Sequence, residues 1–380
     1  MELIKQKLTI MFLAFNGVLC GQVDNSILSG SVPQFPQIPE SFYFHFENLN
    51  FIKNNEYFNR LEEGRTLIGY YLTPCLDYNF SEMIKIRGGV HLLKYSGTDN
   101  FSQLLPVFSI YHAVNEQLCL IFGSIQSSLF HSLPEPDYRF ERLIENHVEN
   151  GIQLIYKNPV LFSDTWLNWE NFINDNDSEQ EKFTAGSSWC INLNKNIIYR
   201  ISAPLNLTVR HRGGQVNKDE ANIQTISNTS AGLRFDVFPE SSPWKINSLG
   251  TEFIVFGYKD FSFHHELPYT SGYACYLTGN IKTRYLQIGA GYWNSYHYYS
   301  PLGEQLFQSI SLIDRHYTDA EKKLAVTKIQ FSKIISQKSA IILRFESYYD
   351  IPNDLYDYSY GIYLKLDADI LFKKMAKPEK

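Results

Sequence analysis

The sequence predicts an all-β protein, a single antiparallel up-and-down transmembrane β-barrel of about 14–16 strands with short periplasmic turns and long extracellular loops. Aromatic residues make up 15% of the chain, with 26 Tyr and 27 Phe, and such side chains favour strands over helices. Apolar and polar residues alternate along most of the chain, as they do in strands with two different faces. Short and long connections between these runs also alternate, and a soluble sandwich has no reason to sort its loops in this way.

The alternation is clearest near the C-terminus, where every even-numbered residue of 356–372 is apolar or aromatic. The run 66–80 has the same form, and the run 83–95 completes a hairpin with it after a short turn. In a membrane barrel one face of each strand meets lipid and the other meets the lumen, which requires a period of two. Sixteen such runs are predicted, at 42–50, 66–80, 83–95, 104–114, 117–126, 151–158, 161–170, 182–192, 197–210, 222–236, 248–258, 271–278, 281–293, 323–335, 340–350 and 356–372.

The connections divide into two classes. Short turns are expected around Ser81, at Asn115–Glu116, at Lys157–Pro159, at Asn194–Asn196, at Gly279–Asn280 and at Ser336–Ser339. Long loops are expected at 51–65, 127–150, 171–181, 211–221, 259–270 and 294–322. Two links break the rule, because 237–247 is long where a short turn is expected and the link near Ile351 is brief. A sheet in hydrocarbon cannot leave its backbone unpaired, so these strands are expected to close into a barrel.

The N-terminal residues 1–21 have the form of a secretory signal peptide, with two lysines before an apolar segment that is too short to span a bilayer. Cleavage near Cys20 is expected, and lipidation of Cys20 is the alternative. The Pro-containing residues 22–40 are expected to form a linker, 41–372 an outer-membrane barrel and 373–380 a polar periplasmic tail. The predicted location is therefore the outer membrane.

The remaining cysteines are far apart in β-like runs, and their spacing predicts neither a zinc site nor a disulfide scaffold. We expect them to be small, buried and unpaired. They are Cys75, Cys119, Cys190 and Cys275.

The polar face of the predicted strands carries charged side chains that suit a wet lumen. The candidate lumen and selectivity residues are Lys85, Arg87, His91, Arg200, Arg210, Arg344 and Glu346. Their positive bias favours anionic solutes if the barrel conducts. Lys282 and Arg284 share parity with apolar Leu286 and Ile288, so they are expected beyond the bilayer edge or next to a bulge. Aromatic residues at strand ends are expected to form an interfacial girdle, namely Tyr292, Trp293, Tyr296, Tyr298 and Tyr299.

No local motif predicts an enzyme, a metal site or a cofactor. The run His264–Glu266 lacks metal-ligand spacing, and 211–214 has glycines and cations without the strand–loop–helix context of a phosphate loop. The acidic run 174–181 lacks the glycine and spacing of a calcium loop and is expected to be a solvated extracellular loop. Because no GxSxG sequence is present, the prediction is that the protein is not an enzyme.

The last predicted strand also carries a candidate assembly signal of the form polar-x-Gly-x-x-apolar-x-apolar. It consists of Ser359, Gly361, Leu364 and Leu366, with Phe372 as the terminal aromatic. Phe372 is followed by eight residues rather than ending the chain. The barrel-assembly machinery is therefore an expected partner.

Four segments, 54–74, 149–156, 300–309 and 348–366, resemble a group of outer-membrane β-barrel proteins from the Bacteroidota. The resemblance extends over nearly the whole chain after residue 40 and implies a porin-like barrel in the cell envelope. The group has no agreed activity, so the resemblance implies no catalytic residues.

The predicted function is that of a porin-like passive diffusion channel or a scaffold for surface loops. The expected partners are outer-membrane lipids, lipopolysaccharide and small solutes, and the net charge of −6 argues against nucleic acid. Two alternatives stay open at this point. One is an outer-membrane enzyme with its site on the barrel wall, and the other is a secreted soluble β-sandwich that acts as a binding module.

Overall fold

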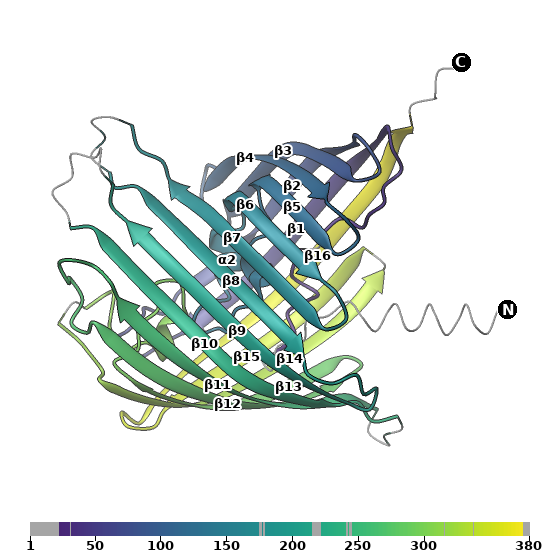
Figure 1. Ribbon diagram of the computed structural model, residues 1–380. Helices are drawn as coiled ribbons and strands as arrows, with labels where there is room; N and C mark the ends of the chain where they lie inside the picture. The colour runs from purple at the N-terminus through teal and green to yellow at the C-terminus, as the bar shows by residue number, and fades with distance from the viewer. Residues whose placement is uncertain are drawn as a thin grey trace, which may run out of the picture.

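The computed structural model is a closed antiparallel barrel in which each strand pairs with its sequence neighbours and the first strand pairs with the last (Figure 1). The structure describes residues 23–30, 32–174, 177, 179–214, 222–240, 242, 245–314, 316–336 and 338–374. The strands are β1 (Ser41–Glu56), β2 (Thr66–Asn79), β3 (Ile84–Tyr95), β4 (Gln103–Ala113), β5 (Leu118–Ser124), β6 (Asn150–Lys157), β7 (Leu161–Asn171), β8 (Lys182–Asn192), β9 (Tyr199–Arg212), β10 (Gln224–Val237), β11 (Ile246–Asp260), β12 (Ser271–Thr283), β13 (Leu286–Tyr296), β14 (Glu321–Ser336), β15 (Ser339–Asp350) and β16 (Leu355–Lys374). The predicted fold class is confirmed, and the sheet has no free edge.

The two faces of each strand follow the predicted alternation. On β2, Ile68 is 42% exposed on the outside, whereas Tyr71 is fully buried against the contents of the barrel. On β16, Tyr360 and Ile362 point outward, and Ser359 and Tyr363 are buried inside. Apolar side chains on the outer surface are what a barrel that faces lipid requires. The even-numbered face of the last strand is therefore the outer face, as the sequence predicted.

One hairpin differs from the prediction. Gly279 and Asn280 were expected to form a turn, but they lie inside β12, and the turn is at Arg284–Tyr285. This two-residue turn reverses the parity between the strands, so Lys282 pairs across from Gln287 and shares its inward face. Lys282 binds Asp24 there. The turn therefore resolves the conflict in side-chain parity that the sequence showed, without a bulge between β12 and β13.

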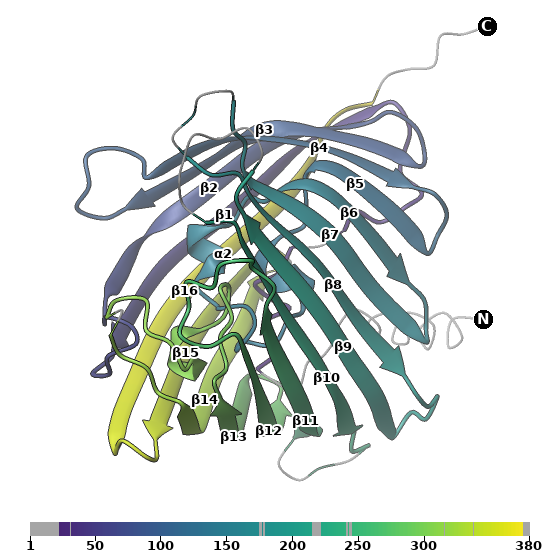
Figure 2. The same cartoon turned by 60° about the vertical axis from the view of Figure 1, so that its left-hand side comes forward.

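Loops fill the interior of the barrel. The connection between β5 and β6 folds inward and contains η1 (Ser128–His131) and α2 (Arg142–Glu145), and Figure 2 shows α2 inside the ring of strands. The connection between β13 and β14 contains η2 (Gln305–Phe307), whose three residues are buried. Arg139 N donates to Leu302 O, so the two loops are hydrogen-bonded to each other. We call the residues 125–149 and 298–311 the plug.

The segment 23–30, expected to be part of a linker, also lies against the inner wall. The side chains of Lys282 and Arg344 bind Asp24 and Asn25, and Lys365 Nζ donates to Leu28 O at 3.5 Å. Leu28 is 1% exposed. This segment thus packs on strands from the far end of the chain.

Three of the predicted girdle aromatics are inside the barrel instead. Trp293, Tyr298 and Tyr299 are buried in one apolar cluster with Phe307 of the plug, so the interfacial role expected for them is wrong. Tyr292 and Tyr296 are exposed on the outer face. Tyr298 and Tyr299 follow β13 and turn inward with the loop, and this change of direction has no signal in a period-two pattern.

Two further observations complete the fold. Cys75, Cys119, Cys190 and Cys275 are free, as expected; the first two are buried as predicted, whereas Cys190 and Cys275 are only half-buried. Among the described residues, no helix is long and apolar enough to cross a membrane.

Candidate functional site

Buried ion pairs hold the plug to the barrel wall. Lys53 of β1 binds Glu141 of the plug, and Lys328 of β14 binds Glu135. Glu346 of β15 lies 3.6 Å from Lys53 Nζ and 3.0 Å from Lys328 Nζ, so it joins the two pairs. Removing one member of a buried pair leaves an uncompensated charge and costs about 3–5 kcal/mol. These contacts therefore fix the plug in the lumen.

His131 at the end of η1 is a second attachment point. Its Nδ1 lies 2.8 Å from Asp164 Oδ2 and its Nε2 lies 3.0 Å from Glu149 Oε2, while its ring stacks on Trp166. Burial alone would lower the pKa of His131, but the carboxylates of Asp164 and Glu149 raise it to about 9. Both ring nitrogens donate, so His131 is a charged clamp and not a general base.

The predicted lumen residues all have polar partners. Lys85 and Arg87 share Asp77, and His91 Nδ1 lies 2.8 Å from the Thr73 hydroxyl. The other pairs are Arg200 with Asp236, Arg210 with Glu170, and Arg344 with Glu346. Each predicted cation therefore faces a carboxylate, which offsets the positive bias seen in the sequence. Their role in selectivity stays a prediction.

One group of described side chains has the spacing of a metal site. His45, Asp77 and Asp369 bring ligand atoms within 4.8 Å of one another. Asp77 already binds Lys85 and Arg87, and His45 Nδ1 lies 2.7 Å from Asp369. A metal ion would have to displace two cations that neutralise Asp77, so this arrangement favours an ion-pair network over a metal centre.

Two neighbouring loop residues singled out in the sequence, His265 and Glu266, have different partners. His265 Nδ1 lies 3.1 Å from Asp260, whereas Glu266 binds Arg212 at 2.8 Å. The neighbouring residues thus point to different partners, as expected for an extended segment.

A set of buried carboxyls lies behind the wall near the extracellular end. Glu62 and Glu304 share a hydrogen bond, and burial together with nearby carboxylates raises the pKa of Glu304 well above its usual range. Burial opposes ionisation of Glu141 as well, but Lys53 holds the pKa of that carboxyl at about 2. Neighbouring carboxyls with separated pKa values can perform acid–base chemistry. Glu141 and Glu304 are part of the plug itself, however, and Glu304 is only 2% exposed.

A different polar cluster lies on the outer face of the same wall. Asn54 Nδ2 donates to Glu56 Oε1 at 2.6 Å and to the Tyr360 hydroxyl at 3.1 Å. The Thr66 hydroxyl donates to Asn54 Oδ1. We call Asn54, Glu56, Thr66 and Tyr360 the rim cluster. It brings together a carboxylate, an amide and two hydroxyls at the extracellular ends of β1, β2 and β16.

Strand pairing creates the rim cluster. Asn54 stands opposite Tyr360 on one side and opposite Thr66 on the other. Side chains opposite each other in an antiparallel pair have Cβ atoms about 4.5–5.5 Å apart, close enough for these hydrogen bonds. Ile52 and Ile68 are exposed on the same face one step toward the bilayer centre, and Phe58 is exposed beyond the end of β1. The rim cluster therefore lies at a boundary between apolar wall and polar loops.

The comparisons with known proteins concern the barrel as a whole. A family model described as lipid A 3'-O-deacylase-type matches residues 36–375. The chain belongs to the lipid A 3'-O-deacylase-type family. The match extends from before β1 to the end of β16, so the whole barrel is the family's unit. No curated protein matches the chain.

Solved structures of outer-membrane proteins share the fold. A loop-deletion mutant of OmpT from Vibrio cholerae aligns with a TM-score of 0.51 and 9% identity, covering 86% of this chain and 100% of that one. OprD from Pseudomonas aeruginosa aligns with a TM-score of 0.52 and 8% identity, covering 89% and 98%. At this identity the likeness concerns the barrel alone. This likeness shows that the protein has the fold of porin-like outer-membrane barrels.

The family membership corrects one prediction. The sequence was expected to encode a protein that is not an enzyme, and a lipid A 3'-O-deacylase-type family points to an enzyme instead. The expectation failed because it relied on local motifs, whereas the family match extends over residues 36–375. The rim cluster leaves one trace in the sequence: Asn54 and Glu56 are polar on the parity that carries Ile52, and Thr66 is polar on the parity of Ile68.

Proposed function

We propose that this protein is an outer-membrane hydrolase that removes an acyl chain from a glycolipid of the lipid A class, with the rim cluster as its active site. The observation that carries the proposal is the position of a hydrogen-bonded carboxylate, amide and hydroxyl set on the outer wall of a lipid A 3'-O-deacylase-type barrel. A membrane lipid can reach this wall by lateral diffusion and needs no path into the lumen. The buried carboxyls behind the wall lack such access.

In the proposed reaction Glu56 acts as the general base. Its carboxylate takes a proton from a water molecule, and the resulting hydroxide attacks the carbonyl carbon of the acyl ester. The bond between that carbon and the sugar oxygen then breaks, and the sugar oxygen takes the proton from Glu56. The products are a fatty acid and a free sugar hydroxyl, so atoms and charge balance.

The other members of the rim cluster have distinct roles. The Tyr360 hydroxyl accepts from Asn54, so its own proton is free to donate to the carbonyl oxygen as negative charge develops there. Asn54 contacts all three partners and is a positioning residue that orients Glu56 and Thr66. Ile52 and Ile68 provide the apolar surface along which the acyl chain lies.

The test is acyl release from lipid A in reconstituted vesicles, followed by mass spectrometry. We expect Glu56→Gln to lower the rate about 100-fold or more, and Tyr360→Phe to have a comparable effect, as for loss of a general base or an oxyanion donor. Glu63→Gln is the matched control, because Glu63 is an exposed carboxylate outside the rim cluster. Wild-type protein without activity, or Glu56→Gln with full activity, would overturn the proposal.

Passive diffusion is the second candidate function, and the polar inner wall of a porin-like barrel favours it. The buried pairs of the plug oppose it, because they fill the lumen with fixed protein. Conductance across a planar bilayer distinguishes the two: a passive channel shows stepwise currents in the intact protein, whereas a plugged hydrolase does not.

Both candidate functions, hydrolase and passive channel, place the protein in the outer membrane. We propose that the N-terminal signal directs its export and that the barrel-assembly machinery inserts it. Residues 1–22 lie outside the described part of the chain, so signal cleavage and lipidation of Cys20 stay predictions. Contact with lipopolysaccharide and origin from the Bacteroidota are parts of the same proposal.

A further inference from the structure

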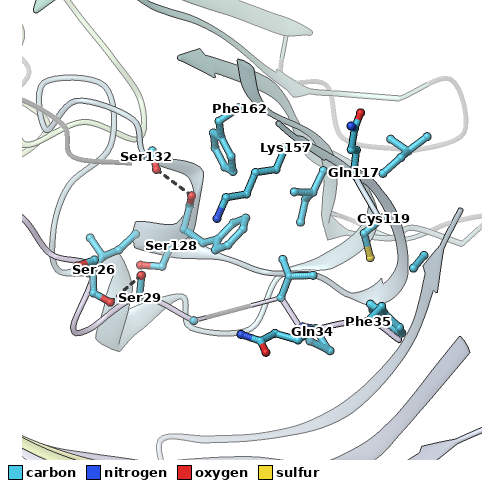
Figure 3. Close-up of a pocket in the computed structure, with 18 of the residues that line it drawn as sticks. Ser26, Ser29, Gln34, Phe35, Gln117, Cys119, Ser128, Ser132, Lys157 and Phe162 are labelled. Atoms are coloured by element: carbon cyan, nitrogen blue, oxygen red, sulfur yellow. Dashed lines mark hydrogen bonds between the residues drawn. The ribbon is translucent and has the colours of Figure 1, made fainter. Parts of the chain in front are cut away.

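A cavity of about 1010 Å³ lies at the periplasmic end of the barrel, beside the plug (Figure 3). Its wall includes the turn Asn115–Gln117 and Lys157 at the end of β6, which place its mouth on the side of the short turns. The segment 32–35 closes one side and η1 closes another. Ligand sites commonly occupy about 300–1,000 Å³, so this space can hold a molecule of substantial size.

Lys157 supplies a positive charge to this cavity. Figure 3 shows its ammonium group pointing inward, toward the side that carries Ser128. No described carboxylate forms an ion pair with Lys157, whereas Lys85 and Asp369 on the same wall are paired with Asp77 and His45. Glu116 stands on the solvent-exposed turn at the mouth. Lys157 is exposed at the end of β6, so the cavity presents at its mouth a cation that has no ion-pair partner among the described residues.

Ser128 supplies a hydroxyl with no partner. It is 2% exposed, its Oγ has no hydrogen bond among the described residues, and it lines this cavity and a second one of about 80 Å³ next to it. Its backbone φ is 55°, a region that serine rarely adopts. A buried hydroxyl without a partner costs free energy, and such costs are retained where a ligand can supply the missing bond.

One side of the wall is apolar, whereas Gln34, Asn115 and Gln117 are among the polar residues on the rest of it. Phe35, Phe130 and Leu133 pack with Phe162 and Val32 around a buried cluster next to the cavity. The cavity therefore combines the ammonium of Lys157 and the hydroxyl of Ser128 with one side of aromatic and aliphatic side chains. The matching ligand is an anion with a long apolar tail.

We propose that this cavity binds a long-chain fatty acid from the periplasmic side, with its carboxylate on Lys157 and Ser128 and its tail along Phe35 and Phe162. A carboxylate accepts hydrogen bonds from both an ammonium and a hydroxyl, and charge-assisted bonds of this kind are the stronger ones. The proposal is independent of the hydrolase: the rim cluster is on the outer wall at the opposite end of the barrel, so either can fail alone.

Photocrosslinking with a diazirine derivative of palmitic acid tests this site in the full-length protein held in nanodiscs. We expect saturable crosslinks to peptides that contain residues 32–35 and 128–133, competed by palmitic acid but about tenfold less well by its methyl ester. Crosslinks to the outer wall, which come from probe dissolved in lipid, should not saturate. They serve as an internal reference for the amount of probe.

Variants complete the test. Lys157→Gln should weaken competition by palmitic acid about tenfold. Val32→Trp should abolish the saturable crosslinks, because the indole would fill the cavity; Val32 belongs to no strand, so the substitution leaves the strands unchanged. Lys195→Gln, on an exposed periplasmic turn away from the cavity, is the matched control. Equal competition by acid and methyl ester, or Lys157→Gln binding like Lys195→Gln, would overturn the proposal. Heat-modifiable electrophoretic mobility confirms that each variant is folded.

Discussion

At the scale of single residues, the inner wall uses charges to hold the plug. Lys53 and Lys328 of the wall contact carboxylates of the plug, and Asp164 of the wall contacts His131 of the plug. Because desolvated charges need close partners, these contacts make the position of the plug specific.

His131 makes the plug sensitive to alkaline pH. Its pKa is about 9 in the folded protein against an ordinary 6.5, so its stabilising contribution is complete below about pH 6.5 and is lost as pH rises through 9. A shift of this size corresponds to about 3 kcal/mol. We expect hydrogen exchange of residues 125–149 to accelerate between pH 7 and pH 10 beyond its intrinsic pH dependence.

The His131→Gln variant provides the control for this pH effect. Its exchange should be faster than that of the wild type at pH 6, and it should lack the additional alkaline acceleration. A wild-type profile that follows only the intrinsic chemistry of exchange would show that His131 does not hold the plug.

At the scale of elements, β16 combines barrel closure with the predicted assembly signal. Ser359 and Gly361 face inward, Leu364 faces outward, and a Cβ on Gly361 would overlap the ring of Tyr363. Glycine is therefore required at this position by a close approach and not by its backbone conformation. The recognition of this strand by the assembly machinery stays a prediction.

We expect Gly361→Ala to destabilise the barrel by about 1–3 kcal/mol, because the added methyl group overpacks the site. The measurement is the urea midpoint of unfolding, read from heat-modifiable mobility. Gly88→Ala is the matched control, since a Cβ at Gly88 would meet nothing within 4 Å. Equal midpoints for the two variants would contradict the packing argument. Gly361→Asp should in addition reduce insertion in cells.

At the scale of the whole molecule, we expect the plug to decide whether the barrel conducts. We expect the intact protein to show little conductance in planar bilayers and Lys53→Met to show frequent stepwise openings. That substitution leaves Glu141 without its ion-pair partner in the lumen, at a cost of about 3–5 kcal/mol.

Lys259→Met, on the exposed face of β11, should behave like the wild type in the same bilayers. Large steady currents through wild-type protein would show that the plug does not seal the barrel. They would favour passive diffusion as the function.

The sequence by itself determined the strands of this protein. The predicted run 182–192 coincides with β8, and 161–170 and 340–350 each differ from their strands by one residue at one end. Strand position is readable because the period-two pattern is local and because each strand must present one apolar face. The turn at Arg284–Tyr285 was missed because both strands beside it are apolar on alternate positions and a short turn can reverse their parity.

Only the tertiary structure decided what fills and what surrounds the barrel. The plug depends on pairs such as Glu135 with Lys328, which are 193 residues apart, so no local pattern records that this loop folds inward. The rim cluster likewise exists because closure of the barrel brings Tyr360 next to Asn54. Both arise from contacts between residues far apart in the sequence. The buried ion pairs and the side chains that face each other across paired strands stabilise them, and the periodicity of a single strand contains no information about either.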